Sequence, residues 1–148
     1  MLKEIFTNLI GNAIVQAGRA IKLKNLEMFG KSKFGITPEQ FVVLSMLNED
    51  SLLHQNKLCE LLYKDKANMA RILSILEEKG LIEKIQKVEN RKQVNKIQIT
   101  ESGKNLRDKI IPFMKTSREQ YLQDISEDEM YTCIKVLNKI QENLAKRK

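Results

Sequence analysis

Apolar residues recur three and four positions apart over much of the chain, which is the spacing of helices that bury one face. The first such stripe runs from Leu2 to Ile21 and predicts a long helix that ends before a loop around Gly30 and Gly35. A stripe of this length needs a packing partner.

A second helix is predicted to begin at Thr37. Thr37 can cap an orphan backbone amide, Pro38 suits the first helical position, and Gln40 can reach back as in a capping box. The residues expected on its buried face are Phe41, Val42, Leu44 and Leu47.

Two further helices are expected in close succession. The first is a short apolar-spaced stretch from Leu58 to Leu62, followed by a tight turn at Tyr63-Lys64. Asp65 is a good N-cap for the second helix, and Gly80 is a typical left-handed stop after it. The residues expected to point inward from this second helix are Met69, Ile72, Leu73, Ile75 and Leu76. The pattern is therefore helix, short turn, helix.

A β-hairpin is predicted next. Residues 81–88 and 94–100 are rich in β-branched side chains, and polar and apolar residues alternate along the second run. The tip, Glu89 to Gln93, is polar and lacks a two-residue Asn-Gly turn, so we expect a longer and mobile loop there.

The C-terminal part of the chain is predicted to be helical. Pro112 is expected to kink one helix, and a capping box at Ser126 to Glu129 opens another whose apolar seam is longer than a small core requires. The first helix has a similar surplus of apolar surface, so we expect the two chain ends to pack together and against a second copy of the protein. The alternative is that both stripes are used within one monomer. The residues expected to form the dimer contact are Leu2, Ile5, Phe6, Leu9, Met130, Cys133, Leu137, Ile140 and Leu144.

Length and composition narrow the class of protein. A chain of 148 residues with 42% hydrophobic and 30% charged residues favours one globular unit, mostly α with a small β-hairpin, over a disordered chain or a membrane span. Two cysteines, Cys59 and Cys133, cannot form a disulfide framework, and the N-terminal run is not typical of a secretion signal. We therefore expect a cytoplasmic setting. The net charge of +7 favours an anionic partner such as nucleic acid.

A helix-turn-helix followed by a hairpin with a basic tip is the winged-helix arrangement, in which the second helix fits the major groove of a DNA duplex. In this interpretation Asn68 could hydrogen-bond the edge of an adenine, and Arg71 could bind a guanine or a phosphate. Arg91 could enter the minor groove. Nine basic residues and five acids lie between Leu62 and Ile97, an excess that supports DNA binding without deciding it. The alternative is that these cations form an ordinary solvated surface. The residues expected to bind DNA are Lys64, Lys66, Ala67, Asn68, Arg71, Lys87, Asn90, Arg91 and Lys92.

Four segments, in this order, resemble the MarR family of bacterial transcription regulators: residues 36–44, 66–71, 76–82 and 99–103. The most specific parts are the Leu-Glu-Glu-Lys-Gly-Leu-Ile exit from the second helix and the acid-x-Arg wing, which leads to Ile-Thr-Glu-Ser-Gly at a helix start. The resemblance covers nearly the whole chain.

This resemblance implies a homodimer built from a helical dimerisation region, residues 1–35 and 101–148, and a winged helix-turn-helix DNA-binding lobe, residues 36–100. It implies binding to a pseudo-palindromic operator duplex, usually with repression that a small-molecule ligand or an oxidant relieves. Two features depart from the family pattern. Glu89 stands where the family usually has an aspartate that braces the wing arginine, and Asn68 and Ala70 replace threonines common in the recognition helix.

Other functions have less support in the sequence. No nucleophile-base pair, phosphate loop or metal-ligand set has useful spacing, so we expect neither an enzyme nor a cofactor or metal site. His54 is read as a local surface residue and Cys59 as a packing thiol. Two alternatives to an operator-binding repressor stay open: a winged-helix module that binds protein without sequence-specific DNA binding, and a thiol-based redox-responsive regulator.

Overall fold

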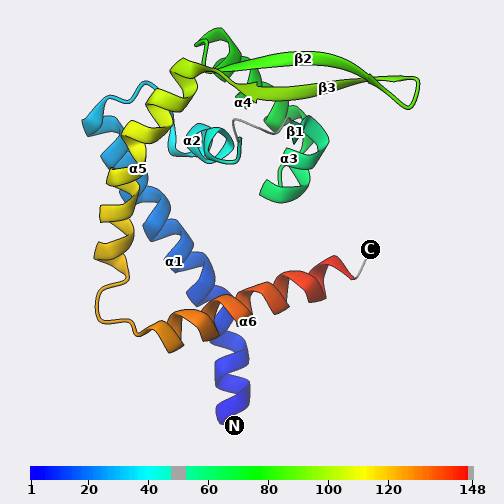
Figure 1. Ribbon diagram of the computed structural model, residues 1–148. Coiled ribbons are helices and arrows are strands. Elements are labelled where there is room, and N and C mark those ends of the chain that lie inside the picture. Colours follow the sequence, from blue (N-terminus) through cyan, green and yellow to red (C-terminus); the bar gives the residue numbers. More distant parts are fainter. Residues whose placement is uncertain (48–52, 147–148) are drawn as a thin grey trace. The chain divides into compact units, whose positions relative to one another are not determined.

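The computed structural model describes residues 1–47 and 53–146, which separate into two compact units, Met1–Met114 and Lys115–Lys148 (Figure 1). The first unit contains α1 (Leu2–Ser32), α2 (Pro38–Ser45), β1 (Leu53–His54), α3 (Gln55–Leu62), α4 (Lys66–Glu78), β2 (Ile82–Glu89), β3 (Lys92–Ile99) and the beginning of α5 (Glu101–Tyr121). The second unit contains the end of α5 and α6 (Glu127–Ala145). The mostly helical architecture with a small sheet is the fold class that the sequence predicts.

The core of the first unit is one cluster of buried apolar side chains supplied by α1 to α5, β2, β3 and the segments between them. Its members are Phe29, Phe34, Ile36, Phe41, Val43, Leu44, Leu47, Leu58, Met69, Ile72, Leu73, Leu76, Leu81, Ile82, Ile97, Ile99 and Ile110. The buried face predicted for α4 is confirmed except for Ile75, which is only half-buried. On α2 the prediction for Val42 was wrong, because residues 40, 43, 44 and 47 share the buried stripe and Val42 falls beside it, 40% exposed.

Helix α1 continues through Gly30 to Ser32, past the end that the sequence predicts, and stops where Lys33 adopts a left-handed φ of 52°. Aromatic contacts hold this last turn. The ring of Phe29 lies 5.2 Å from that of Phe34 and 5.9 Å from that of Phe41. These contacts outweigh the cost of a glycine inside a helix, which is about 1 kcal/mol relative to alanine.

Three helices begin with the caps that the sequence predicts. Thr37 accepts from the backbone N–H of Gln40 and receives the Gln40 side chain in return, as a capping box does. Ser126 and Glu129 form the same arrangement at the start of α6, and Asp65 caps α4. At its other end α4 closes with Gly80 at a φ of +70° and the N–H of Leu81 bonded to the carbonyl of Leu76.

The sheet has the strand order β1-β3-β2, with both pairings antiparallel. The sequence predicts only the β2–β3 hairpin. The third strand, β1, pairs Leu53 with Ile97 and His54 with Lys96, and so connects the start of α3 to the base of the hairpin. The hairpin extends beyond the helices of the first unit (Figure 1).

The hairpin turn differs from the expected longer loop. The strands pair as far as Glu89 and Lys92, so that only Asn90 and Arg91 form the turn, with φ values of 50° and 62°. Two consecutive positive φ values are typical of the type I′ hairpin turn. Asparagine tolerates this conformation well, whereas arginine rarely adopts it, so the residue types at this position do not indicate a tight turn.

Candidate nucleic-acid interface

Helix α4 is held at the surface by the α3–turn–α4 connection. Tyr63 adopts a left-handed φ of 50°, which lets the N–H of Lys64 return to the carbonyl of Cys59 at 3.0 Å. One side of α4 is then fixed by its four fully buried apolar residues. Its outer side is left for a partner, and Lys66, Ala67 and Arg71 are exposed there.

Asn68 lies in the first turn of α4 and is half-buried. Its backbone N–H donates to Oδ1 of Asp65 at 2.8 Å, which fixes the beginning of the helix. Its side-chain Oδ1 accepts from Nη2 of Arg71 at 3.1 Å. The two polar residues expected to read bases are therefore bonded to each other.

Lys64 is tied to the protein by an ion pair with Glu39 in the first turn of α2. The Lys64 side chain is only 17% exposed. The hydrogen bond from Lys64 holds the pKa of Glu39 below its ordinary value, and the charges of Lys64, Lys22 and Arg71 act in the same direction. Because Glu39 and Lys64 are 25 residues apart, no spacing rule in the sequence could have indicated this pair.

The wing presents cations that have no partner. Lys87, Asn90, Arg91 and Lys92 are all exposed. Within residues 1–47 and 53–146, the side chains of Lys66, Lys87, Arg91 and Lys92 make no hydrogen bond or ion pair. Lys84 and Lys96, by contrast, pair with Glu77 and Glu89. Unpaired positive charge therefore lies on the outer side of α4 and along the hairpin toward its tip.

Glu89 does not hold the wing arginine. Its carboxylate forms an ion pair with Lys96, and its Oε2 lies 3.3 Å from Nε2 of His54. The hydrogen bond from Lys96 is the largest cause of a lowered Glu89 pKa, and His54 adds to it. His54 occupies the N-cap position of α3 without a side-chain capping bond. Glu89, which stands where the family usually has an aspartate that braces the wing arginine, therefore joins the wing to the helix-turn-helix instead.

None of the residues expected at a dimer contact is buried in the single chain. On α1, Leu2, Ile5, Phe6 and Leu9 are 47–67% exposed. On α6 no residue is buried; Cys133 and Leu144 are exposed, whereas Met130, Leu137 and Ile140 are half-buried.

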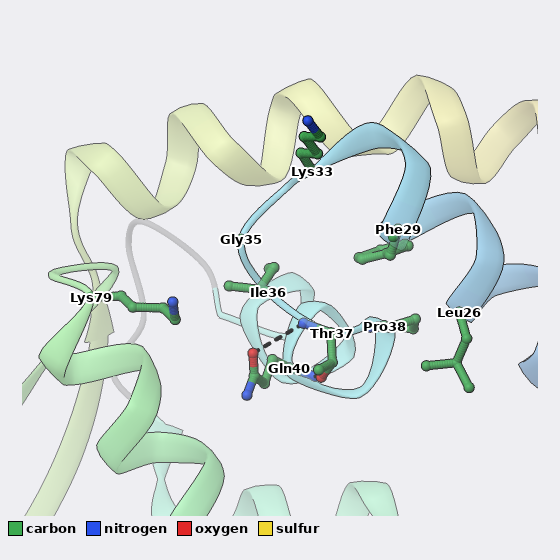
Figure 2. A pocket seen from close by; sticks show the side chains of 10 residues that line it. Leu26, Phe29, Lys33, Gly35, Ile36, Thr37, Pro38, Gln40 and Lys79 are labelled. Carbon is green, nitrogen blue, oxygen red and sulfur yellow. Dashed lines mark hydrogen bonds between the residues drawn. The ribbon is translucent and has the colours of Figure 1, made fainter.

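A pocket of about 540 Å³ lies between the end of α1 and the start of α2, with Lys79 at the end of α4 forming another side. Figure 2 shows Thr37 and Gln40 joined by their capping bond, with the Lys79 side chain extending toward them. A second pocket, of about 450 Å³, lies farther along the contact of α1 with α2 and is lined by Lys22, Glu39 and Val42 among others.

Both cysteines are free thiols. Cys59 is partly buried against the core, and Cys133 is exposed on α6. In the part of the chain that the structure describes, no three histidine, cysteine or acidic side chains gather in a group able to hold a metal ion. Nor does any described helix combine the length and the apolar character needed to cross a membrane.

A model of the MarR family matches residues 36–94. This chain carries a MarR-family domain. The chain is 28% identical over 113 residues to YybA of Bacillus subtilis (strain 168), an uncharacterised HTH-type transcriptional regulator; the match covers 74% of this chain and 72% of YybA. Several solved structures share the fold, among them the following two. The transcriptional regulator SlyA is 28% identical with a TM-score of 0.78, covering 93% of this chain and 94% of SlyA. The S. aureus MepR–DNA complex is 23% identical with a TM-score of 0.78, covering 91% of this chain and 96% of MepR.

The MarR-family domain contains every residue that the sequence analysis places at the DNA interface, from Lys64 to Lys92. Its α3–α4 pair and its hairpin are the helix-turn-helix and the wing of the regulator fold. The features that sequence reasoning missed are β1, the Glu39–Lys64 pair and the contact of His54 with Glu89.

Proposed function

We propose that this protein is a homodimeric transcription regulator that binds a pseudo-palindromic DNA operator through α4 and the wing. The observation that carries the proposal is the pairing of an exposed helix-turn-helix with a hairpin whose tip holds unpaired cations, Arg91 and Lys92. An α-helix fits the major groove, and an arginine at a wing tip can enter a narrow minor groove. The MepR–DNA complex, which shares the fold, supports DNA as the partner.

The cations of this surface have two proposed roles. Lys66, Lys87 and Lys92 have flexible exposed side chains and would mainly neutralise phosphates, which gives affinity and strong salt dependence. Arg71 and Arg91 would contact bases. Lys64, which already neutralises Glu39, would act chiefly by fixing the turn before α4.

The proposed dimer uses the terminal helices, residues 1–35 and 101–148, and leaves residues 36–100 as the DNA-binding lobe. The exposed apolar side chains of α1 and α6 support it, because apolar side chains left exposed along a helix favour an interface. A twofold dimer places two recognition helices about 34 Å apart, so that they enter successive major grooves on one side of the duplex.

The proposed regulation is repression relieved by a small molecule. The two pockets beside α2 have volumes of about 540 and 450 Å³, within the range of small-ligand sites. Lys33 and Lys79 at the larger pocket favour an anionic ligand. A ligand there would change the position of the lobe and thereby the separation of the two recognition helices.

Fluorescence anisotropy tests the function. The full chain is titrated with duplex from the region upstream of its own gene and with a scrambled duplex, at several salt concentrations. We expect preferential binding with a steep salt slope, and a loss of about 1–3 kcal/mol for Arg71→Ala and for Arg91→Ala on the preferred duplex. Lys92→Ala is the matched control and should mainly reduce the salt slope.

Two results would contradict this proposal. If the upstream duplex is not preferred over the scrambled one and a genome-wide selection yields no preferred duplex either, the protein does not act through sequence-specific DNA binding. Weak binding with a shallow salt slope would then favour a winged-helix module that binds protein. Unchanged titrations for both arginine variants would refute the assigned contacts.

A further inference from the structure

Two polar side chains on the outer surface of α4 are bonded to each other. Nη2 of Arg71 donates to Oδ1 of Asn68 at 3.1 Å, across one helical turn. Asn68 is itself fixed, because its backbone N–H is capped by Asp65. The position of the Arg71 guanidinium is therefore set by a neighbour in the first turn of the helix.

The hydrogen bond also fixes the orientation of the Asn68 amide. A guanidinium group can only donate hydrogen bonds, so the amide atom that faces Arg71 must be the oxygen. The Nδ2 group of Asn68 therefore points away from Arg71, and one of the two lone pairs of the amide oxygen is occupied. While the bond is made, donors predominate on the pair: Nδ2 of Asn68 and the remaining N–H groups of Arg71 stand beside a single remaining lone pair of Oδ1.

Glu39 is the anion that could compete for Arg71. The charge of Arg71 contributes to lowering the pKa of Glu39, so the two groups lie within electrostatic reach. Lys64, however, forms the ion pair with Glu39. Lys64 thus compensates that carboxylate, and Arg71 is bonded to Asn68 on the outer side of α4.

A surface on which donors predominate favours one base. In the major groove adenine presents an acceptor and a donor, so a two-bond contact needs the Asn68 side-chain oxygen, which already accepts from Arg71. Guanine presents two acceptors, O6 and N7. We infer that the Asn68–Arg71 pair reads a guanine in each half-site, with Arg71 donating to O6 and N7 and Asn68 acting as a positioning residue. This inference rests on the proposed function and replaces the adenine contact expected for Asn68 from the sequence.

The test begins with selection of tight-binding duplexes from a pool with randomised half-sites, using the full chain. Each guanine common to the selected half-sites is then replaced by 7-deazaguanine, which lacks the N7 acceptor, or by inosine, which keeps the major-groove edge of guanine. At the proposed position we expect 7-deazaguanine to weaken binding about five- to 150-fold and inosine to change it less than about twofold. Selected half-sites without a common guanine, or without sensitivity to 7-deazaguanine, would overturn the inference.

Variants separate base reading from phosphate binding and from folding. Arg71→Ala should remove the discrimination between guanine and 7-deazaguanine. Asn68→Ala keeps the backbone N–H that Asp65 caps, and should reduce the same discrimination without lowering the thermal midpoint. Lys66→Ala, on the same helix, is the control and should weaken binding to both duplexes equally.

The outcomes distinguish this inference from the proposed function. Equal losses on guanine and 7-deazaguanine duplexes for Arg71→Ala would make Arg71 a phosphate contact, which overturns the inference and leaves DNA recognition standing. Full discrimination in Asn68→Ala would refute the positioning role. Failure of the selection to enrich any duplex would refute the proposed function and the inference together.

Discussion

His54 and Glu89 connect the helix-turn-helix to the wing, with Nε2 of the histidine 3.3 Å from Oε2 of the carboxylate. His54 is the N-cap residue of α3, and Glu89 is the last residue of β2, immediately before the turn. Lys96 of β3 holds the same carboxylate and is paired with His54 in the register of the sheet. The orientation of the hairpin is thus linked to the start of α3 by a polar contact as well as by strand pairing.

This cluster predicts the titration of Glu89. Its pKa is lowered from 4.5, first by the hydrogen bond from Lys96, so the favourable pairing is complete above that value and is lost as the pH falls through the lowered pKa. We expect Lys96→Met to raise the Glu89 pKa toward its ordinary value, and His54→Ala to raise it less. Carbon-detected NMR of the side-chain carboxyl measures both effects.

Lys92→Met provides the control for that titration. Lys92 lies opposite Glu89 in the strand register but forms no ion pair with it among the described residues. Its removal should therefore move the pKa of Glu89 less than Lys96→Met does. A larger shift with Lys92→Met would mean that the general charge of the wing, and not the contact with Lys96, lowers the pKa.

The conformation of the two-residue turn predicts that a substitution of Arg91 can lower DNA affinity without lowering stability. Arg91 adopts a φ of 62°, which glycine adopts without strain, so Arg91→Gly should leave the thermal midpoint within a few degrees. The same change removes the unpaired guanidinium, and we expect DNA affinity to fall by about 1–3 kcal/mol. Thermal unfolding and anisotropy measure the two effects.

Asn90→Gly is the matched control for the turn. It changes the neighbouring residue with positive φ but keeps the arginine, so stability should be retained and DNA affinity should fall less than in Arg91→Gly. Equal losses of affinity in the two variants would show that the conformation of the turn, rather than the guanidinium of Arg91, matters for binding.

The sequence predicted those parts of the fold that depend on local spacing and local capping. The inward residues of α4, the caps at Thr37, Asp65 and Ser126, and the stop at Gly80 all follow from residues within one or two turns of each other. Local rules were sufficient because each of these features is decided by neighbours along the chain.

Features decided by distant residues were not predicted. Strand β1 exists because β3 offers it an edge more than 40 positions later, and Glu39 finds Lys64 only when the turn before α4 is folded. The candidate interface shows the same division. Its exposed cations could be named from the pattern, whereas the pairing of Glu89 with Lys96 and its contact with His54 required the arrangement in space.

A side chain at position 103 should strongly destabilise the protein. Gly103 lies in the first turn of α5, and a Cβ built there would approach the carbonyl oxygen of Leu81 to 2.1 Å and Cγ1 of Ile99 to 2.8 Å. Because the first of these atoms is backbone, α5 must move away from the sheet to admit a methyl group. We expect Gly103→Ala to lower the free energy of unfolding by about 1–3 kcal/mol or more, measured by urea unfolding.

Gly30→Ala is the opposite case. A Cβ at Gly30 meets no atom within 4 Å, and the residue lies inside α1. Alanine is the better helix former, so this change should raise the free energy of unfolding by about 0.5–1 kcal/mol. If Gly103→Ala were as well tolerated as Gly30→Ala, the close approach of α5 to Leu81 would be refuted.

The proposed dimer predicts which apolar positions tolerate a charge. Leu9 and Leu144 are 55% and 66% exposed in the single chain, so Leu9→Glu and Leu144→Glu should leave the helical circular dichroism of the monomer unchanged. In a dimer each would bury an unpaired carboxylate, which is costly, and sedimentation equilibrium should show a shift toward monomer. Operator affinity should fall with it, because a single lobe reads only one half-site. Tyr131→Glu adds the same charge to α6 at a 71% exposed position outside the expected seam, and should remain dimeric. Dissociation by Tyr131→Glu with retention of the dimer in Leu9→Glu and Leu144→Glu would place the interface on a different face of the terminal helices.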